Sequence, residues 1–103
     1  MRVVFVTCPP GKSVEILTTL VRERLVACGN IVPHVRSVYW WKDAIHDDAE
    51  EIVWMETATD RIDVLMQRIK EIHPYEVPKI LFFDPKEGLP DYLAWVNAET
   101  RPR

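Results

Sequence analysis

The chain changes direction within one six-residue run, His73-Pro74-Tyr75-Glu76-Val77-Pro78, and this run decides how its second half folds. Each proline disfavours the helical conformation for the residue before it, so His73 should end a helix and Val77 should already be extended. The run therefore predicts a rigid connector from helix to strand that carries an imidazole, a phenol and a carboxylate. A purely structural role also fits, because histidine complements the dipole at a helix C-terminus and tyrosine often fills the rim of a core.

Hydrophobic spacing places a helix before this connector and a strand after it. Asp60 is a candidate N-cap, and the apolar residues that follow recur at helical intervals, namely Ile62, Leu65, Met66, Ile69 and Ile72. The β-prone segment 77–83 predicts a strand, and a short closing helix should begin near Pro90.

The first half of the chain shows the same order of strand and helix. Residues 3–8 form a continuous β-prone run that ends at Pro9-Pro10-Gly11, which predicts a central strand buried on both faces. An apolar stripe at helical spacing extends from Val14 to Cys28, with Gly29 as the expected stop. Segments 31–41 and 51–57 favour strands, and the polar stretch 42–49 between them should form the tip of a long hairpin.

The order strand, helix, strand, strand, helix, strand is that of the split βαβ, or ferredoxin-like, fold. It predicts a single α+β domain over residues 1–103, with an antiparallel sheet and the helices on one of its faces. Large side chains alternate along the first hairpin strand, so Tyr39 and Trp41 should point to one face and Val38 and Trp40 to the other. A small domain with such a surface commonly uses it in assembly, and we expect a homo-oligomer.

Composition argues against several classes of function. The 103 residues carry a net charge of -3, and no basic stripe or nucleic-acid-reading motif occurs, so we expect no nucleic-acid partner. The apolar run near the N-terminus is too short for a signal peptide or a membrane span, which predicts a cytoplasmic protein with no membrane partner. Cys8 and Cys28 should be reduced thiols, with Cys28 in the core. Cys8 and His73 lack a third orienting group, and we expect no enzyme activity.

Five segments resemble the CutA (divalent-cation tolerance) family. They are Val6-Thr7-Cys8-Pro9, residues 24–33, Ser37-Val38-Tyr39-Trp40-Trp41, the run 73–78 and Asp91-Tyr92-Leu93-Ala94-Trp95. The resemblance implies a ferredoxin-like protomer in a PII-like homotrimer, in which the long hairpin completes a neighbour's sheet. It also implies a link to copper and other divalent cations, with a first-strand cysteine and the histidine before the Pro-Tyr pair as proposed ligands.

The metal hypothesis takes His73, and possibly with it Cys8, as copper ligands. His73 matches the family's histidine, whereas Val6 occupies the usual cysteine position and Cys8 lies two residues later on the same face, about 7 Å further along the strand. Thiolate favours Cu(I), and imidazole binds Cu(I), Cu(II) or zinc.

The alternative hypothesis is a PII-like sensor or scaffold. Tyr75, Glu76 and Lys79 would then hold a small anion or metabolite in a cleft between protomers, and metal effects would be indirect. An electropositive cleft would favour this hypothesis, whereas clustered thiol and imidazole would favour metal.

Two charges are reversed together relative to the family's usual residues. Glu56 stands where lysine is usual, and Lys79 stands where glutamate is usual. If the two side chains faced each other across adjacent strands, reversing both would preserve their attraction, so we expect a structural Glu56–Lys79 ion pair. Asp43, where the family often has glycine, should lie in the hairpin turn.

Overall fold

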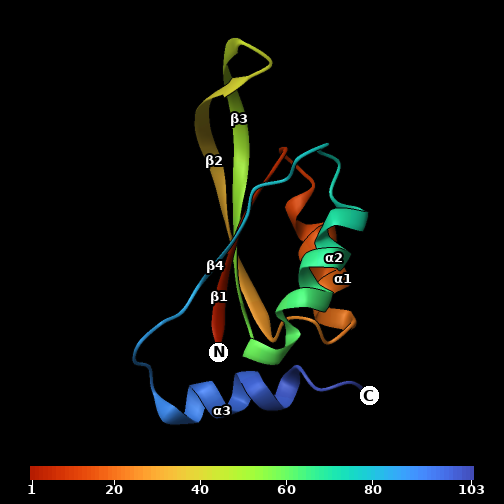
Figure 1. Cartoon of the computed structure of the whole chain (residues 1–103), viewed down its shortest axis with the longest axis vertical. Helices are drawn as coiled ribbons and strands as arrows, with labels where there is room; N and C mark the ends of the chain where they lie inside the picture. Colours follow the sequence, from red (N-terminus) through yellow and green to blue (C-terminus); the bar gives the residue numbers. More distant parts are fainter.

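The computed structural model describes all 103 residues and contains one four-stranded sheet with three α-helices (Figure 1). In chain order the elements are β1 (Arg2–Cys8), α1 (Ser13–Arg22), β2 (Cys28–Trp41), β3 (Ala44–Thr57), a 3-10 turn η1 (Thr59–Arg61), α2 (Ile62–Ile72), β4 (Ile80–Phe83) and α3 (Pro90–Glu99). The strand order is β2-β3-β1-β4, with all neighbours antiparallel. The predicted ferredoxin-like α+β fold is confirmed, with β1 as a central strand.

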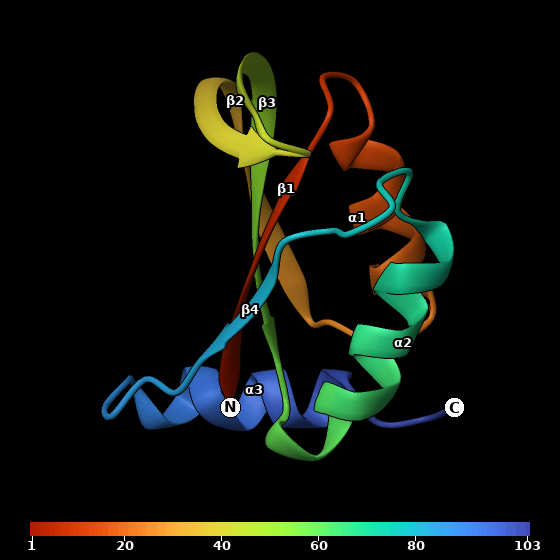
Figure 2. The ribbon, with the colours of Figure 1, turned by 45° about the horizontal axis from the view of Figure 1, so that its top comes forward.

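Helices α1 and α2 lie side by side on one face of the sheet, while α3 crosses its end near the N-terminus (Figures 1 and 2). The core lies between the sheet and the α1–α2 pair. Its buried side chains are Val4, Val6, Cys8, Ile16, Leu20, Leu25, Val26, Val53, Met55, Leu65 and Ile69. None of the three α-helices is both long and apolar enough to span a membrane.

Helix α1 is shorter than predicted, since it ends at Arg22 rather than near Cys28. Arg24 adopts the left-handed conformation, with φ of 62°. The chain then makes the two hydrogen bonds of a Schellman motif, one of them from the Leu25 N–H to the Leu20 carbonyl oxygen at 3.0 Å. Leu25 is buried in the segment that leads into β2, which explains why the apolar stripe looked continuous in the sequence.

The β2–β3 hairpin is tighter at its tip than predicted. Its turn consists of Lys42 and Asp43 alone, both with positive φ (49° and 63°), as a type I′ turn requires. The position expected for Asp43 is confirmed. The rest of the polar stretch belongs to β3, where Asp47 accepts a hydrogen bond from the Arg36 Nε at 2.8 Å across the hairpin. The acidic residues there are partners of β2 rather than loop residues.

The connector behaves as predicted at its first residue, and the following strand starts later than predicted. His73 ends α2 with extended backbone (φ -77°, ψ 136°). Strand β4 begins at Ile80 rather than at 77 because Pro78 has no N–H for a sheet ladder. Asp60 is not an N-cap: it lies in η1, and its carboxylate accepts two hydrogen bonds from Arg101 at 2.6 and 2.7 Å.

Thr57 provides a test of this packing. Its fully buried hydroxyl donates to the Leu25 carbonyl oxygen at 2.7 Å. Thr57→Val keeps the shape but removes the donor, and should lower the free energy of unfolding by about 1–3 kcal/mol in urea denaturation. Thr19→Val, which removes an exposed hydroxyl that donates to the Glu15 carbonyl oxygen, should change it by about 0.5 kcal/mol or less. Equal losses in both variants would contradict this assignment.

Candidate functional site

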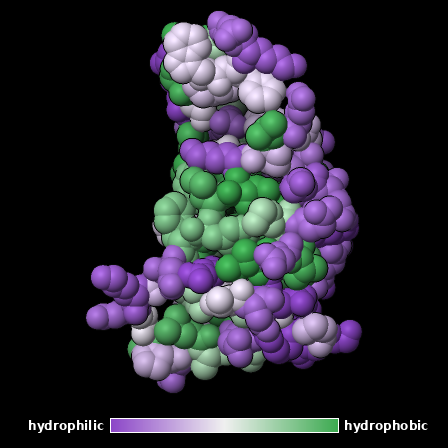
Figure 3. All heavy atoms as spheres, viewed as in Figure 1, coloured by the Kyte–Doolittle hydropathy of each residue, from purple (hydrophilic) through white to green (hydrophobic).

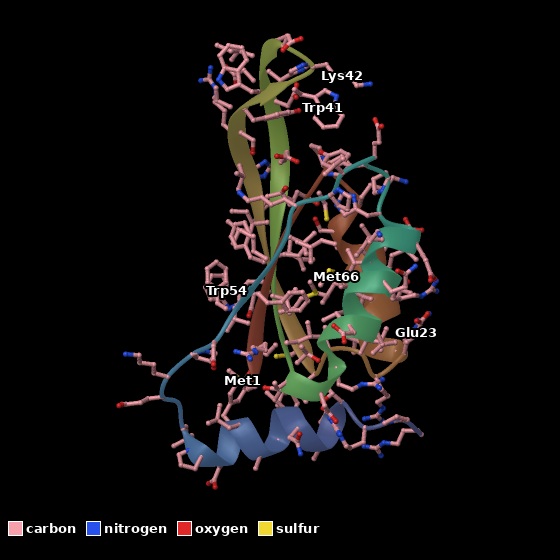
Figure 4. All side chains as sticks on the ribbon, viewed as in Figure 1. Met1, Glu23, Trp41, Lys42, Trp54 and Met66 are labelled. Carbon is pink, nitrogen blue, oxygen red and sulfur yellow. The ribbon has the colours of Figure 1, made fainter.

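A cleft of about 610 Å³ opens between the β2–β3 hairpin and the connector that follows α2. It is lined by Thr7, Ser37, Val38, Tyr39, Trp41, Glu50, Pro74, Tyr75, Glu76, Val77 and Lys79. Figure 4 shows Trp41 and Lys42 at the far end of the hairpin, on the side from which the connector approaches. The cleft therefore brings together Tyr75, Glu76 and Lys79, the three residues named above for a ligand cleft.

Glu50 is the buried charged residue of this cleft, with 6% of its surface exposed. The Tyr75 hydroxyl donates to its Oε2 at 2.7 Å. Burial raises the pKa of Tyr75, and the Glu50 carboxylate raises it further, so the phenol remains a donor. The sequence did not single out Glu50, because its neighbours from Asp47 to Glu51 are also acidic and nothing in the pattern marks one of them as buried.

The exposed charges of the cleft are engaged with other groups. Glu76 lies 3.8 Å from the ammonium of Lys42, which links the connector to the hairpin tip. Lys79 directs its ammonium over the Phe5 ring, 5.1 Å from the centroid. The cleft is thus not lined by free positive charge, and it is not the electropositive cleft that would have favoured the sensor hypothesis.

His73 attaches the connector to strand β1 through hydrogen bonds. Its Nδ1 accepts a hydrogen bond from the Tyr75 N–H at 3.1 Å, so its Nε2 carries the hydrogen and donates to the Thr7 carbonyl oxygen at 2.8 Å. The ring also lies against Tyr75, with 4.8 Å between centroids. Both ring nitrogens are therefore used within the chain.

Cys8 does not offer a ready metal ligand. Its side chain is fully buried, and burial raises the pKa of its thiol to about 11. A copper ion on His73 would displace one of the imidazole's two hydrogen bonds, and one on Cys8 would need a thiolate inside the core. No three side chains of the His, Cys, Asp or Glu type come together to hold a metal. Within the protomer, the imidazole of His73 is thus engaged in two hydrogen bonds and the thiol of Cys8 lies in the core.

The expected Glu56–Lys79 ion pair is not formed within the chain. The strand register places Glu56 opposite Val3 of β1, whereas the residue after Lys79 pairs with Val6. Both side chains belong to the same face of the sheet, but β1 separates their strands and they are offset by roughly 13 Å along it. The expectation that the two side chains face each other across adjacent strands was wrong, because β3 and β4 are not neighbours in the sheet.

Glu56 instead contacts α3 and the start of β2. Its Oε1 accepts hydrogen bonds from the Tyr92 hydroxyl at 2.8 Å and the Cys28 thiol at 3.3 Å. Cys28 is accordingly a partly exposed strand residue and not the helical core residue that we expected.

Comparison with known proteins assigns almost the whole chain to one family. The family model described as "CutA1 divalent ion tolerance protein" matches residues 2–99. The chain belongs to the CutA1 divalent ion tolerance family. The divalent-cation tolerance protein CutA of Pyrococcus horikoshii is 41% identical to this CutA1 chain over 102 residues, which is 98% of this chain and 99% of that protein. Protein CutA of mouse is 37% identical over 97 residues, but this chain spans only 55% of its length.

Solved structures of relatives have the same fold. The divalent cation tolerance protein Cut A1 from Thermus thermophilus superposes with a TM-score of 0.93 at 38% identity, covering 98% of this CutA1 chain and 100% of that one. The PII-like protein CutA from Nostoc sp. PCC 7120 superposes with a TM-score of 0.94 at 35% identity, and the match covers both chains completely. The names of these relatives refer to divalent-cation tolerance and to a PII-like protein.

The two thiols should differ in reactivity. At pH 8 a thiol of pKa about 11 is ionised in roughly one molecule in a thousand, so buried Cys8 should alkylate much more slowly than partly exposed Cys28. Iodoacetamide labelling of the native protein, followed by mass spectrometry, measures both rates. Cys28→Ser serves as the control that isolates Cys8. Labelling of Cys8 as fast as a free peptide thiol would contradict its assignment to the core.

Proposed function

We propose that this protein is a PII-like ligand-binding member of the CutA1 family, in which a small molecule held in the cleft determines contacts with a partner protein. The observation that carries the proposal is the cleft itself. Its walls come from segments far apart in the sequence, with Tyr39 and Trp41 contributed by the hairpin and Tyr75 by the connector. A volume of about 610 Å³ falls within the roughly 300–1,000 Å³ range of small-molecule pockets.

The cleft is built so that a ligand can affect the hairpin. Lys42 and Glu76 join the hairpin tip to the connector, and both are largely exposed. An exposed ion pair contributes little stability, about 0–1 kcal/mol, and opens readily. A molecule in the cleft would contact Glu76 and the neighbouring Trp41 of the hairpin, and could thereby open the pair and move the hairpin relative to the connector.

We also propose that the protein acts as a homotrimer in the cytoplasm. The sheet face opposite α1 and α2 exposes large apolar side chains, among them Trp54 at 44%, Leu81 at 45% and Phe83 at 50%. Figure 4 shows Trp54 pointing away from the two helices, and Figure 3 shows a band of hydrophobic side chains across the middle of the molecule. Such an exposed face is typical of a protein interface, and the PII-like name of the Nostoc relative supports the assembly. Both cysteines are free thiols, in keeping with a reducing compartment.

Charge on this face should prevent assembly. Trp54→Glu and Leu81→Glu each place a carboxylate in the proposed interface, and we expect trimers to dissociate to monomers in size-exclusion chromatography with light scattering. Val14→Glu is the matched control, because Val14 is 65% exposed on α1 and away from that face. Trimers that persist in both interface variants would show that another surface is used.

Direct copper binding through His73, possibly with Cys8, is the second candidate function. It is favoured by the divalent ion tolerance for which the family is named. It would require the imidazole to give up a hydrogen bond to Thr7 or Tyr75, and the thiol to ionise within the core. For these reasons we rank it second.

Copper calorimetry distinguishes the two candidates. Cu(I) under reducing conditions and Cu(II) without reductant should bind weakly and at no whole-number ratio, and His73→Ala and Cys8→Ser should not alter this. The buried thiol and the engaged imidazole are the physical reason. Tight binding at a whole-number ratio that either substitution abolishes would establish the metal function instead. Lys70→Ala, an exposed change on α2, controls for effects of substitution alone.

A further inference from the structure

The charged groups of the cleft indicate which chemical class of ligand it binds, an inference that rests on the proposed function. The two oxygens of Glu50 differ: Oε2 accepts from the Tyr75 hydroxyl, whereas Oε1 makes no hydrogen bond within the chain and remains accessible to solvent. No basic side chain of the chain forms an ion pair with Glu50. Glu50 is only 6% exposed, and its accessible Oε1 lies in the lining of the cleft, where a donor or a cation that enters can reach it.

The basic groups near the cleft do not supply that cation. The Lys79 ammonium lies over Phe5, and the Lys42 ammonium lies 3.8 Å from Glu76. An anionic ligand would therefore meet the free oxygen of Glu50 and would have to draw Lys79 away from the Phe5 ring. Repulsion of this kind disfavours an anion.

The remaining wall is suited to an organic cation. Tyr39, Trp41 and Tyr75 line the cleft with aromatic rings, and Val38 and Val77 add aliphatic surface. An aromatic face attracts a cation through the negative charge density of its ring, and apolar walls accept a hydrocarbon body. A bare divalent ion would instead need four or more oxygen, nitrogen or sulfur ligands, and the wall holds only two carboxylates, Glu50 and Glu76.

We infer that the cleft binds a small organic cation, an ammonium or guanidinium group on an apolar body, with Glu50 as its counter-ion and the aromatic side chains of the hairpin and connector around it. From the sequence we expected a small anion or a metabolite near Tyr75, Glu76 and Lys79, and the charges of the cleft now favour a cation over the anion. The cation takes the place that a basic side chain would otherwise occupy beside Glu50.

Three probes of one shape and different charge test the inference on the assembled protein. They are 2-phenylethylammonium, 2-phenylethanol and phenylacetate, with binding measured by calorimetry and by protein NMR shifts. The ammonium should bind at least tenfold more tightly than the alcohol, a difference of about 1.4 kcal/mol, and phenylacetate should bind least. This comparison uses the unaltered chain and does not depend on the folding of any variant.

A pair of variants assigns the preference to one carboxylate. Glu50→Gln should weaken the ammonium at least tenfold and leave the alcohol nearly unchanged. Glu56→Gln is the matched control, since Glu56 is equally buried, at 7% exposed, yet does not line the cleft. Ammonium binding that falls equally in both variants would overturn the role of Glu50.

Failure of the inference can be distinguished from failure of the proposed function. Preferred binding of phenylacetate or inorganic phosphate, weakened by Lys79→Gln, would overturn the cation and leave the ligand cleft standing. Binding of Ca²⁺ that Glu50→Gln abolishes, with no response to the ammonium, would overturn it in favour of an inorganic ion. Absence of binding by all these probes would overturn both the cation and the ligand cleft.

Discussion

The cleft depends on the position of one imidazole ring. Pro74 and Pro78 each lack an N–H, so a regular hydrogen-bond ladder to the sheet is interrupted at both ends of the connector. His73 supplies the missing attachment, because it donates to the Thr7 carbonyl oxygen on β1 and accepts from the Tyr75 N–H. These two bonds fix Tyr75 over the cleft, and Tyr75 in turn fixes the Glu50 carboxylate. Removal of the ring would release the whole wall.

The sequence predicted best those features that depend on local stereochemistry and periodicity. The prolines correctly indicated that His73 ends a helix, and alternation of β-prone and helical segments correctly indicated the ferredoxin-like order. The left-handed conformation of Arg24 could not be predicted, since glycine is the usual residue there and nothing in an arginine indicates that conformation. The polar residues 44–49 were wrongly assigned to the hairpin tip because the sequence does not show their partners. Asp47, for example, pairs with Arg36, which lies on the neighbouring strand and 11 residues away in the chain.

The sequence predicted which face of the sheet a side chain occupies, because side chains alternate along a strand, but it did not predict which residues pair across strands. Alternation assigns Glu56 and Lys79 to one face of the sheet, but parity repeats every two residues and does not reveal the register. Burial of Glu50 was likewise hidden, because it depends on Tyr75, which is 25 residues away in the sequence and reaches it only through the fold of the connector. The sequence therefore identified one wall of the cleft and missed the charge of the other.

The same two hydrogen bonds also bear on the metal tolerance for which the family is named. An imidazole that holds the connector in place cannot bind a metal ion through either nitrogen without loosening Tyr75, and Tyr75 orders the cleft. Metal on His73 and an ordered cleft are thus competing states of one ring. The hydrogen bonds that order the cleft therefore also keep the imidazole from acting as a metal ligand, which is the physical reason for expecting His73 to be a structural residue.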